Sequence, residues 1–260
     1  MGENSGASTY ILGTEDRRRL ELLEQCLDPL TTRSLDAIGV KPGWRCLELG
    51  GGGGSVTRML CDRVGPAGRV AAVDLDTRFL DEIDAANLDV VCQNVLTDGI
   101  PPGSYDLAHA RMLLMHLPTR ETFVGEMAAA LGPGGWLLIE DLDTCALPEL
   151  AEGVFADVLS KAIEAFHVAG ASGTFGRQMP ALFDAAGLEE VEASCELMTF
   201  RGGSTQAQMF IASIAQLRPA LLAVGTTEDQ LEGFNQLVSD PTKWFPGFAL
   251  YSVRGRAPAI

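Results

Sequence analysis

Residues 46–60 read CLELGGGGGSVTRML, an apolar run that passes through five consecutive glycines into a pattern typical of a helix. Glycine adopts positive φ angles and lets a ligand approach the bare backbone. The first turn of the following helix offers unpaired N–H groups and the positive end of the helix dipole. This stretch therefore predicts a strand, a glycine loop and a helix that together bind a nucleotide-like cofactor.

Strand and helix patterns alternate after this stretch. We expect short strands, apolar enough to be buried on both faces, at 45–49, 69–74, 89–93, 105–110 and 136–141. Between them, residues 55–64 and 119–131 place apolar side chains on one face of a helix. This alternation predicts right-handed crossovers and an α/β fold with a doubly wound parallel sheet.

Further elements are expected on both sides of this core. Residues 15–39 predict a helical segment with a break at Pro29, and the Gly-Pro-Gly-Gly sequence at 132–135 predicts a turn before a strand. Later in the chain, we expect helical segments at 143–169, 180–186 and 204–238, and strands at 189–200 and 248–254. The length suits one large domain with helical insertions.

The composition argues against several classes of partner. Among 260 residues, 35 acidic and 19 basic side chains give a net charge of −16, which would repel a nucleic-acid backbone. The run Arg17-Arg18-Arg19 stands among acidic residues, so we expect it on a solvated helix face. The six cysteines form no CxxC pair, as expected for free thiols in a reducing cytoplasm. No stretch approaches the ~20 apolar residues of a membrane span.

Two classes of cofactor fit a strand, a glycine loop and a helix. The dinucleotide fingerprint requires G-x-G-x-x-G, but its last position falls on Ser55 or Val56, depending on which glycine begins the count. The pattern acidic-x-G-x-G-x-G is complete in Glu48, Gly50, Gly52 and Gly54. This second pattern resembles the first motif of class I S-adenosylmethionine-dependent methyltransferases.

The resemblance implies which residues hold S-adenosylmethionine. Asp74 ends the second expected strand, where the family places a carboxylate on the ribose hydroxyls, and Leu75 would pack against the adenine. Asn94 and Val95 stand where the family recognises the adenine edge. Asn94 replaces the usual Asp there, and its amide still offers a donor and an acceptor.

The match continues through residue 141. The backbone around Ala110 and Arg111 would lie against the methionine portion of the cofactor, and residues 131–135 resemble the family's turn before its fifth strand. The strands expected at 189–200 and 248–254 fit the antiparallel reversal that distinguishes this fold from nicotinamide-binding Rossmann domains. The resemblance thus implies a Rossmann-like, seven-stranded, mostly parallel sheet with an antiparallel C-terminal strand and a helical cap.

The resemblance also suggests how the chain is divided. Residues 1–40 would form an N-terminal helical segment that covers the active site, and residues 41–260 the methyltransferase domain, with cap insertions at about 143–174 and 203–240. Tyr10 and residues 176–180 and 255–258 stand in segments that resemble a bacterial subgroup acting on small molecules, including secondary metabolites.

Methyl transfer is an in-line displacement, so the enzyme must chiefly position the acceptor and exclude water. A general base is needed only where the acceptor must lose a proton. His116 follows the fourth expected strand, on the side of the sheet that binds ligands, and could serve as base or substrate anchor. Tyr10 could approach the cofactor or be a simple aromatic anchor, and His109 is expected in the core. No carboxylate grouping indicates a metal site.

The sequence therefore predicts transfer of the S-adenosylmethionine methyl group to a small, largely apolar acceptor, with S-adenosylhomocysteine as the second product. Carbon, oxygen and nitrogen acceptors all stay open. Two alternatives also stay open: a protein of the same fold that uses the bound cofactor non-reactively, and a nicotinamide-dependent oxidoreductase. The apolar faces of 20–35 and 209–222 could pack within the chain or form a homodimer.

Overall fold

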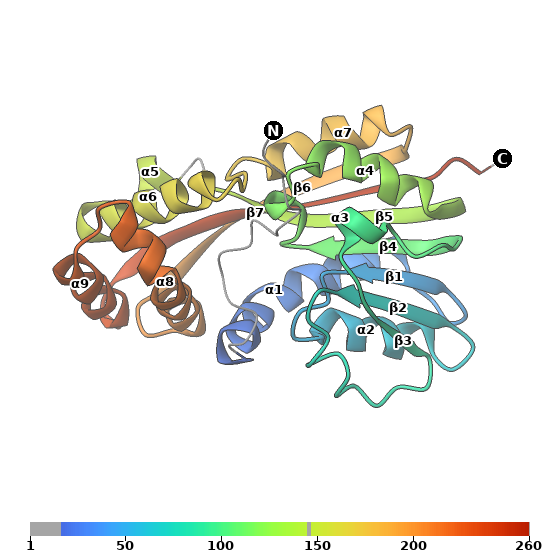
Figure 1. The fold of residues 1–260 in the computed structure, drawn as a ribbon, viewed down its shortest axis with the longest axis horizontal. Coiled ribbons are helices and arrows are strands. Elements are labelled where there is room, and N and C mark those ends of the chain that lie inside the picture. Colours follow the sequence, from blue (N-terminus) through green and yellow to red (C-terminus); the bar gives the residue numbers. More distant parts are fainter. Residues whose placement is uncertain (1–16, 145–146, 260) are drawn as a thin grey trace.

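The computed structural model describes residues 17–144 and 147–259, which are built around one seven-stranded sheet (Figure 1). The strand order is β3-β2-β1-β4-β5-β7-β6, and β7 runs antiparallel to both of its neighbours while the other pairs are parallel. The strands are β1 (Arg45–Leu49), β2 (Arg69–Asp74), β3 (Leu88–Cys92), β4 (Tyr105–Arg111), β5 (Leu131–Asp143), β6 (Glu189–Arg201) and β7 (Trp244–Arg256). The mostly parallel sheet with a reversed last strand is confirmed.

Helices cover both faces of this sheet. They are α1 (Arg17–Ile38), α2 (Ser55–Val64), α3 (Val95–Asp98), α4 (Arg120–Ala129), α5 (Leu147–Leu150), α6 (Gly153–Val168), α7 (Met179–Ala185), α8 (Thr205–Ala223) and α9 (Glu228–Ser239), with short 3-10 turns η1 (Leu114–His116) and η2 (Gly176–Gln178). Helices α1 and α2 lie on one face, and α4 and α7 on the other (Figure 1). Helices α6, α8 and α9 form a helical lobe beyond the end of β5.

The helical lobe has an aromatic core of its own. Phe155 of α6 stacks on Phe234 of α9, with ring centroids 5.6 Å apart, and its ring lies 4.9 Å from that of Phe245 on β7. Phe200 and Phe210 complete the cluster. Aromatic pairs at these separations stabilise packing beyond the area they bury. The long strands β6 and β7 thus tie the lobe to the sheet.

The predicted break at Pro29 is wrong, because α1 continues through this residue. Proline removes a helix hydrogen bond and normally kinks or breaks the helix. Here residues before and after Pro29 form hydrogen bonds to side chains of the sheet. Asp28 accepts a hydrogen bond from Arg111 (2.9 Å), and Thr31 donates one to Glu140. These contacts hold α1 across the sheet in spite of the proline.

The turn predicted at 132–135 is instead the irregular start of β5. The register of β5 against β4 shifts between Tyr105 and Leu107. A Cβ added at Gly135 would lie 2.5 Å from the carbonyl oxygen of Tyr105, so the close approach of the two backbones requires glycine. Strand β5 also continues to Asp143, and the helices expected from 143 onward begin later.

The helical block expected at 204–238 is divided into two helices. Gly225, with φ of 91°, lies in the turn between α8 and α9. Thr227 then begins α9 with a capping box, in which its side chain accepts from the N–H of Gln230 and the Gln230 side chain accepts from the N–H of Thr227. Within the described residues, no helix is long and apolar enough to cross a membrane.

Candidate active site

The five glycines connect β1 to α2 at the end of the sheet where the parallel strands finish. Gly50, Gly52 and Gly54 have φ angles of 72°, 53° and 89°, which side chains other than glycine rarely adopt. The N–H of Gly50 donates to the carbonyl of Val73 (2.8 Å), and that of Gly52 to the carboxylate of Asp74 (2.8 Å). The loop is therefore shaped by its glycines and fixed to the end of β2.

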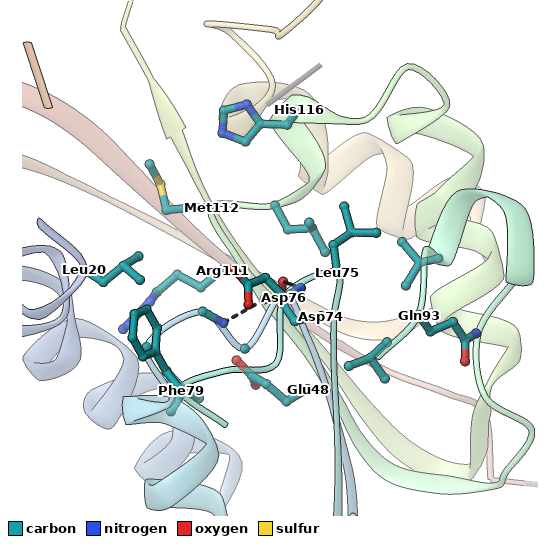
Figure 2. A pocket seen from close by; sticks show the side chains of 18 of the residues that line it. Leu20, Glu48, Asp74, Leu75, Asp76, Phe79, Gln93, Arg111, Met112 and His116 are labelled. Carbon is teal, nitrogen blue, oxygen red and sulfur yellow. Dashed lines mark hydrogen bonds between the residues drawn. The ribbon is translucent and has the colours of Figure 1, made fainter. Parts of the chain in front are cut away.

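A cavity of about 170 Å³ lies against this loop (Figure 2); we call it the first cavity. The predicted site residues that line it are Glu48, Gly50, Gly52, Asp74, Leu75, Asn94, Val95, Arg111 and His116. Gly54 and Ala110 do not line it: Gly54 caps α2, and Ala110 is fully buried in β4. Figure 2 shows Leu20 and Phe79 on one side of the cavity and Gln93 on the other.

The end of β2 contributes a buried carboxylate and an exposed apolar side chain. Asp74 accepts hydrogen bonds from the N–H groups of Gly52 (2.8 Å) and Asp76 (3.1 Å). Burial raises the pKa of Asp74, and these backbone donors oppose that rise. Leu75 next to it is 52% exposed and faces the same cavity. This pair can accept hydrogen bonds from a diol and cover an apolar ring.

The segment after β3 supplies the polar edge of the cavity. The side-chain oxygen of Asn94 accepts a hydrogen bond from the N–H of Leu96 (3.0 Å) and so caps α3. The side-chain amide of Gln93 donates to the carbonyl of Gly99 (2.6 Å). Asn94 and Val95 are thus fixed by local hydrogen bonds at the wall of the cavity.

Glu48 belongs to a buried ionic cluster beneath the cavity. Its carboxylate lies 2.6 Å from Nδ1 of His109, whose Nε2 lies 3.5 Å from Glu140. Burial lowers the pKa of His109, but the charges of Glu48 and Glu140 outweigh this and raise it to about 9. The pKa of Glu140, which burial alone would raise, falls to about 2 through its bonds to His109, Thr31 and Ser252. His109 is therefore a charged core residue that orients Glu48.

The His109 cluster predicts a loss of stability at alkaline pH. Because the folded-state pKa of His109 is raised, its contribution to stability is complete below about pH 6.5 and is lost as the pH rises through about 9. We expect the melting temperature to fall over this range. His109→Gln should melt lower at neutral pH and lose this component of the pH dependence. Circular dichroism melts of both proteins across the range test this, and equal slopes would contradict it.

Helix α1 is joined to the glycine loop and β4 by polar contacts. The carboxylate of Glu24 accepts from the N–H of Ser55 (3.1 Å), and the Ser55 hydroxyl donates to Asp28 (2.8 Å). Arg111 forms an ion pair with Asp28 and donates to the hydroxyl of Thr31, both at 2.9 Å. The side chain of Arg111 is thus bound to α1, and Arg111 also lines the first cavity. That its backbone lies against the methionine portion of the cofactor stays a prediction.

A second cavity, of about 130 Å³, adjoins the first. Its walls come from α1, η1, α6, α8, and the ends of β5 and β7, and apolar side chains predominate among them. Leu23, Met112 and His116 line both cavities. Met112 has φ of 55°, an uncommon conformation for a residue other than glycine. The shared residues place the second cavity directly beside the first.

His116 lines both cavities, and Figure 2 shows its ring near Met112 at the edge of the first. It is 5% exposed, and its ring lies 5.9 Å from that of Phe166 on α6. Burial, followed by the positive charges of Arg19 and Arg120, lowers the pKa of His116 to about 4. The imidazole is therefore neutral at neutral pH and can accept a hydrogen bond from a ligand in either cavity.

Two predictions concern the N-terminal segment. Tyr10 lies outside the described residues, so its role stays a prediction. The expectation that Arg17, Arg18 and Arg19 form a solvated face is wrong for Arg19, which is 2% exposed and lines the second cavity. Arg17 and Arg18 are exposed, and contact Glu82 and Gln208. Since α1 turns by about 100° per residue, three consecutive arginines cannot all face the solvent once the helix packs on the protein.

Comparison with known proteins agrees with this geometry. The model of the family Methyltransf_23, described as a methyltransferase domain, matches residues 15–193, which is more than half of the chain. The chain belongs to this methyltransferase-domain family. The predicted S-adenosylmethionine dependence is thereby confirmed for the domain.

Curated relatives of this methyltransferase domain match about half of the chain. Methyltransferase str3 of Strobilurus tenacellus is 36% identical over 149 residues, covering 55% of this chain and 52% of that protein. The ubiquinone/menaquinone biosynthesis C-methyltransferase UbiE of Ectopseudomonas mendocina is 29% identical over 127 residues, covering 46% and 50%. The chain spans about half the length of these curated relatives.

Solved structures share the fold of the methyltransferase domain over nearly its whole length. The cyclase SpnF superimposes with a TM-score of 0.58 at 18% identity, covering 99% of this chain and 86% of that one. At this identity the likeness concerns the fold alone. The family model ends at residue 193, whereas this superposition also extends over the part of the chain that contains α8, α9 and β7.

The first cavity fits S-adenosylmethionine. An added Cβ at Gly52 would meet nothing nearer than 3.9 Å, so the loop leaves open space on the cavity side of this residue. Asp74 can accept from ribose hydroxyls, Leu75 can cover the adenine, and the backbone around Asn94 and Val95 can meet its polar edge. These residues would hold the cofactor in the methyltransferase domain.

Some cavity residues of the methyltransferase domain escape prediction from the sequence. They are Leu20, Leu23 and Glu24 of α1, Asp76 and Phe79 after β2, and Leu113 and Leu117 after β4. The apolar members follow patterns that ordinary core packing also produces. Glu24 could have been identified from its spacing to Asp28. Two carboxylates four residues apart on one helix face repel each other, which indicates that each has a hydrogen-bonding partner elsewhere in the fold.

Proposed function

We propose that the protein transfers the methyl group of S-adenosylmethionine to a small, largely apolar acceptor about the size of a single ring. The observation that carries this proposal is the second cavity, which joins the first at Leu23, Met112 and His116. Its volume of about 130 Å³ is close to the ~150 Å³ of an engineered apolar cavity that binds benzene. An aromatic or alicyclic acceptor therefore fits beside the cofactor.

The residues of the chain would contribute to catalysis chiefly by positioning the cofactor and the acceptor. When bound, S-adenosylmethionine supplies an electrophilic methyl group. The glycine loop and Asp74 would fix its nucleoside, and the apolar side chains of Met112 and Leu23, which line both cavities, would help to exclude water between cofactor and acceptor. Holding two reactants in line can supply roughly 7 to 11 kcal/mol of the barrier, so little acid–base chemistry is required.

His116 would orient the acceptor as a neutral hydrogen-bond acceptor. Because its pKa is about 4, the wild-type rate should show no histidine inflection near the usual value of 6.5. We expect His116→Gln to lower kcat/KM for methyl transfer by about tenfold, the effect of one hydrogen bond, with little change in cofactor affinity. Exposed His167→Gln serves as the control. An inflection near pH 6.5 that disappears in His116→Gln would show that His116 is a general base instead.

The proposed activity is tested by incubating the protein with methyl-labelled S-adenosylmethionine and a panel of single-ring phenols, amines and indoles. The expected result is label in one class of acceptor together with stoichiometric S-adenosylhomocysteine. The class of compound that takes up the label indicates which kind of atom accepts the methyl group. Conversion of a substrate with no transfer of label would favour the non-reactive alternative, because one fold can host unrelated reactions. The family match and the reversal of β7 count against the nicotinamide alternative.

Several finer expectations are part of the same proposal. We retain residues 1–40 as a cover of the site and 143–174 and 203–240 as its cap, because α1, α6 and α8 line the second cavity. A role in bacterial secondary metabolism rests on the sequence resemblance.

A cytoplasmic location is supported by the free thiols of the described cysteines. A homodimer stays a proposal that sedimentation velocity can test.

A further inference from the structure

The segment that follows β4, residues 112–117, forms a wall of both cavities; we call it the η1 segment. Met112 and His116 line both cavities, Leu113 lines the first, and Met115 lines the second. Its centre is a single 3-10 turn of three residues, whose hydrogen-bond geometry is poorer than that of an α-helix. The position of this segment, and with it the shape of the proposed acceptor site, therefore depends on bonds to the rest of the fold.

Hydrogen bonds from β5 and from the loop after α6 hold the backbone of the η1 segment. The N–H of Met112 donates to the carbonyl of Glu140 (2.8 Å), and the N–H of Ser172 donates to the carbonyl of Met115 (2.9 Å). The N–H of Met115 itself donates to the carboxylate of Asp141, also at 2.9 Å. This N–H belongs to the start of the turn, where backbone donors have no acceptor within the helix. A side chain of β5 thus supplies the acceptor.

Asp141 is a fully buried carboxylate at the end of β5 that lines neither cavity. Its second oxygen accepts from the N–H of Leu142, again at 2.9 Å. Burial of a charged group is costly unless donors match it, and here each oxygen has a backbone donor. An ionised carboxylate is an acceptor at both oxygens, whereas protonation places a hydroxyl donor on one of them. The two donors therefore fit the ionised form.

We propose that Asp141 is a positioning residue that fixes the η1 segment and so shapes the acceptor cavity. The inference rests on the proposed function, because it takes the second cavity as the acceptor site. Asp141 acts through the backbone of Met115, which lines that cavity. Loss of this bond should weaken binding of a ring compound by about tenfold. The affinity for adenosine should not change, because its proposed site lies at the ends of β2 and β3.

Ionisable groups lie on the elements packed around Asp141. They are Glu140 and Asp143 of β5, Arg120 of α4, His116 of η1, Arg177 of η2 and Tyr251, the pairing partner of Asp141 on β7. Burial raises the pKa of Asp141 to about 7, although its backbone donors and the charge of Arg120 oppose the rise. The pKa values of Glu140 and His116, about 2 and about 4, lie well below this value. Burial raises the pKa of Tyr251 above its usual value, and Arg177 pairs with Asp143.

The binding test uses uncharged ring compounds on the protein saturated with S-adenosylhomocysteine. Calorimetric titrations with phenol, benzamide and indole between pH 5.5 and 8.5 should show affinity that rises about tenfold with pH, with an inflection near 7. Asp141→Asn presents an amide donor to one N–H, as the protonated acid does. It should therefore bind the rings at every pH as weakly as the wild type does at pH 5.5. Binding by this variant as tight as that of the wild type at pH 8 would overturn the proposal.

Two control variants locate the effect on Asp141. The carboxylate of Asp106 accepts from the N–H of Arg45 (2.8 Å) and lines neither cavity, so Asp106→Asn makes the same chemical change elsewhere. It should bind the rings as the wild type does. The inflection should also persist in His116→Gln, which distinguishes it from titration of that histidine. An inflection that remains in Asp141→Asn would contradict the proposal.

Stability and hydrogen exchange separate positioning from a loss of folding. Because the folded-state pKa of Asp141 is raised, the stability that its protonation contributes is complete below about pH 3.8 and is lost as the pH rises through about 7. Asp141→Asn should therefore melt at least as high as the wild type at pH 8 while it binds rings more weakly. A merely structural role would lower both quantities together.

Hydrogen exchange of residues 112–117, followed by mass spectrometry, measures the positioning itself without a ring compound. We expect faster exchange in Asp141→Asn than in the wild type at pH 8, and equal exchange would contradict the proposal. Should the variant fail to fold, the wild type is compared at pH 5.5 and 8.5, with rates corrected for intrinsic exchange. Faster corrected exchange at the lower pH supports the proposal, and equal corrected rates overturn it.

The same measurements separate this inference from the proposed function. A wild type that shows the expected exchange but binds none of the three rings at pH 8 would support the role of Asp141 and count against the second cavity as acceptor site. Failure to bind S-adenosylhomocysteine would count against methyl transfer, while exchange in the cofactor-free protein would still test Asp141. Ring binding that follows the protection of the η1 segment, in pH and in the variant, would support both proposals.

Discussion

Gly52→Val is expected to weaken binding of S-adenosylmethionine by roughly 1,000-fold, or about 4 kcal/mol. Gly52 has φ of 53°, which a β-branched residue adopts only with strain. Its missing Cβ faces open space, with Gly50 O at 3.9 Å and Leu20 at 4.0 Å as the nearest atoms. A valine there would project into the first cavity, where the cofactor backbone must approach the loop. Calorimetric titration of the variant measures the loss.

The matched control for this variant is Gly65→Val. Gly65 ends α2 with φ of 62°, has no atom within 4 Å of an added Cβ, and lies outside both cavities. It therefore introduces the same kind of backbone strain without filling the cofactor site. We expect a lower melting temperature in both variants and a loss of cofactor binding only in Gly52→Val. Equal cofactor affinities in the two variants would show that the glycine loop is not the cofactor site.

Asp74→Ala is expected to weaken cofactor binding by about 100-fold. The carboxylate of Asp74 would accept the two ribose hydroxyls, and hydrogen bonds to a charged group are stronger than those between neutral partners. Because burial already raises the pKa of Asp74, further donors from the ligand should stabilise its ionised form. The variant also releases the N–H of Gly52, which Asp74 holds at 2.8 Å.

The neighbouring carboxylate provides the comparison for Asp74. Asp76 lines the same cavity but forms an ion pair with Arg78 at 3.0 Å. We expect Asp76→Ala to change cofactor affinity by less than about threefold. Titration with adenosine, as well as with S-adenosylhomocysteine, shows whether the loss in Asp74→Ala comes from the nucleoside. The assignment of the ribose site to Asp74 fails if Asp76→Ala has the larger effect.

The elements nearest the glycine loop could be predicted almost residue by residue. Strands β1 and β2 and helix α2 have the predicted bounds, because each is a short apolar pattern that ends at glycines or at an acidic residue. Sequence motifs also locate the glycine-loop, β2 and β3 side of the first cavity, since the loop and the ends of β2 and β3 lie next to one another in any sheet of this order. Strands β5, β6 and β7 are longer than predicted, because their extensions are held by pairing with neighbouring strands, which no local sequence pattern specifies.

The polar contacts of the site could not be predicted from spacing. Arg111 meets Asp28 across 83 positions of sequence, and Glu48 meets His109 across 61. Such pairs depend on the packing of α1 against the sheet, which no local pattern specifies. Arg19 shows the same limit, because its neighbours Arg17 and Arg18 have the expected exposure and only the rotation of α1 places Arg19 in the second cavity.

The most direct test of the central claim is calorimetric titration of the purified, cofactor-free protein with S-adenosylhomocysteine, with NAD and NADP as competitors. The proposed function predicts one molecule bound per chain in the micromolar range and no displacement by either nicotinamide cofactor. A folded protein that gives no heat with S-adenosylhomocysteine or S-adenosylmethionine, or that binds NAD or NADP in their place, would contradict it.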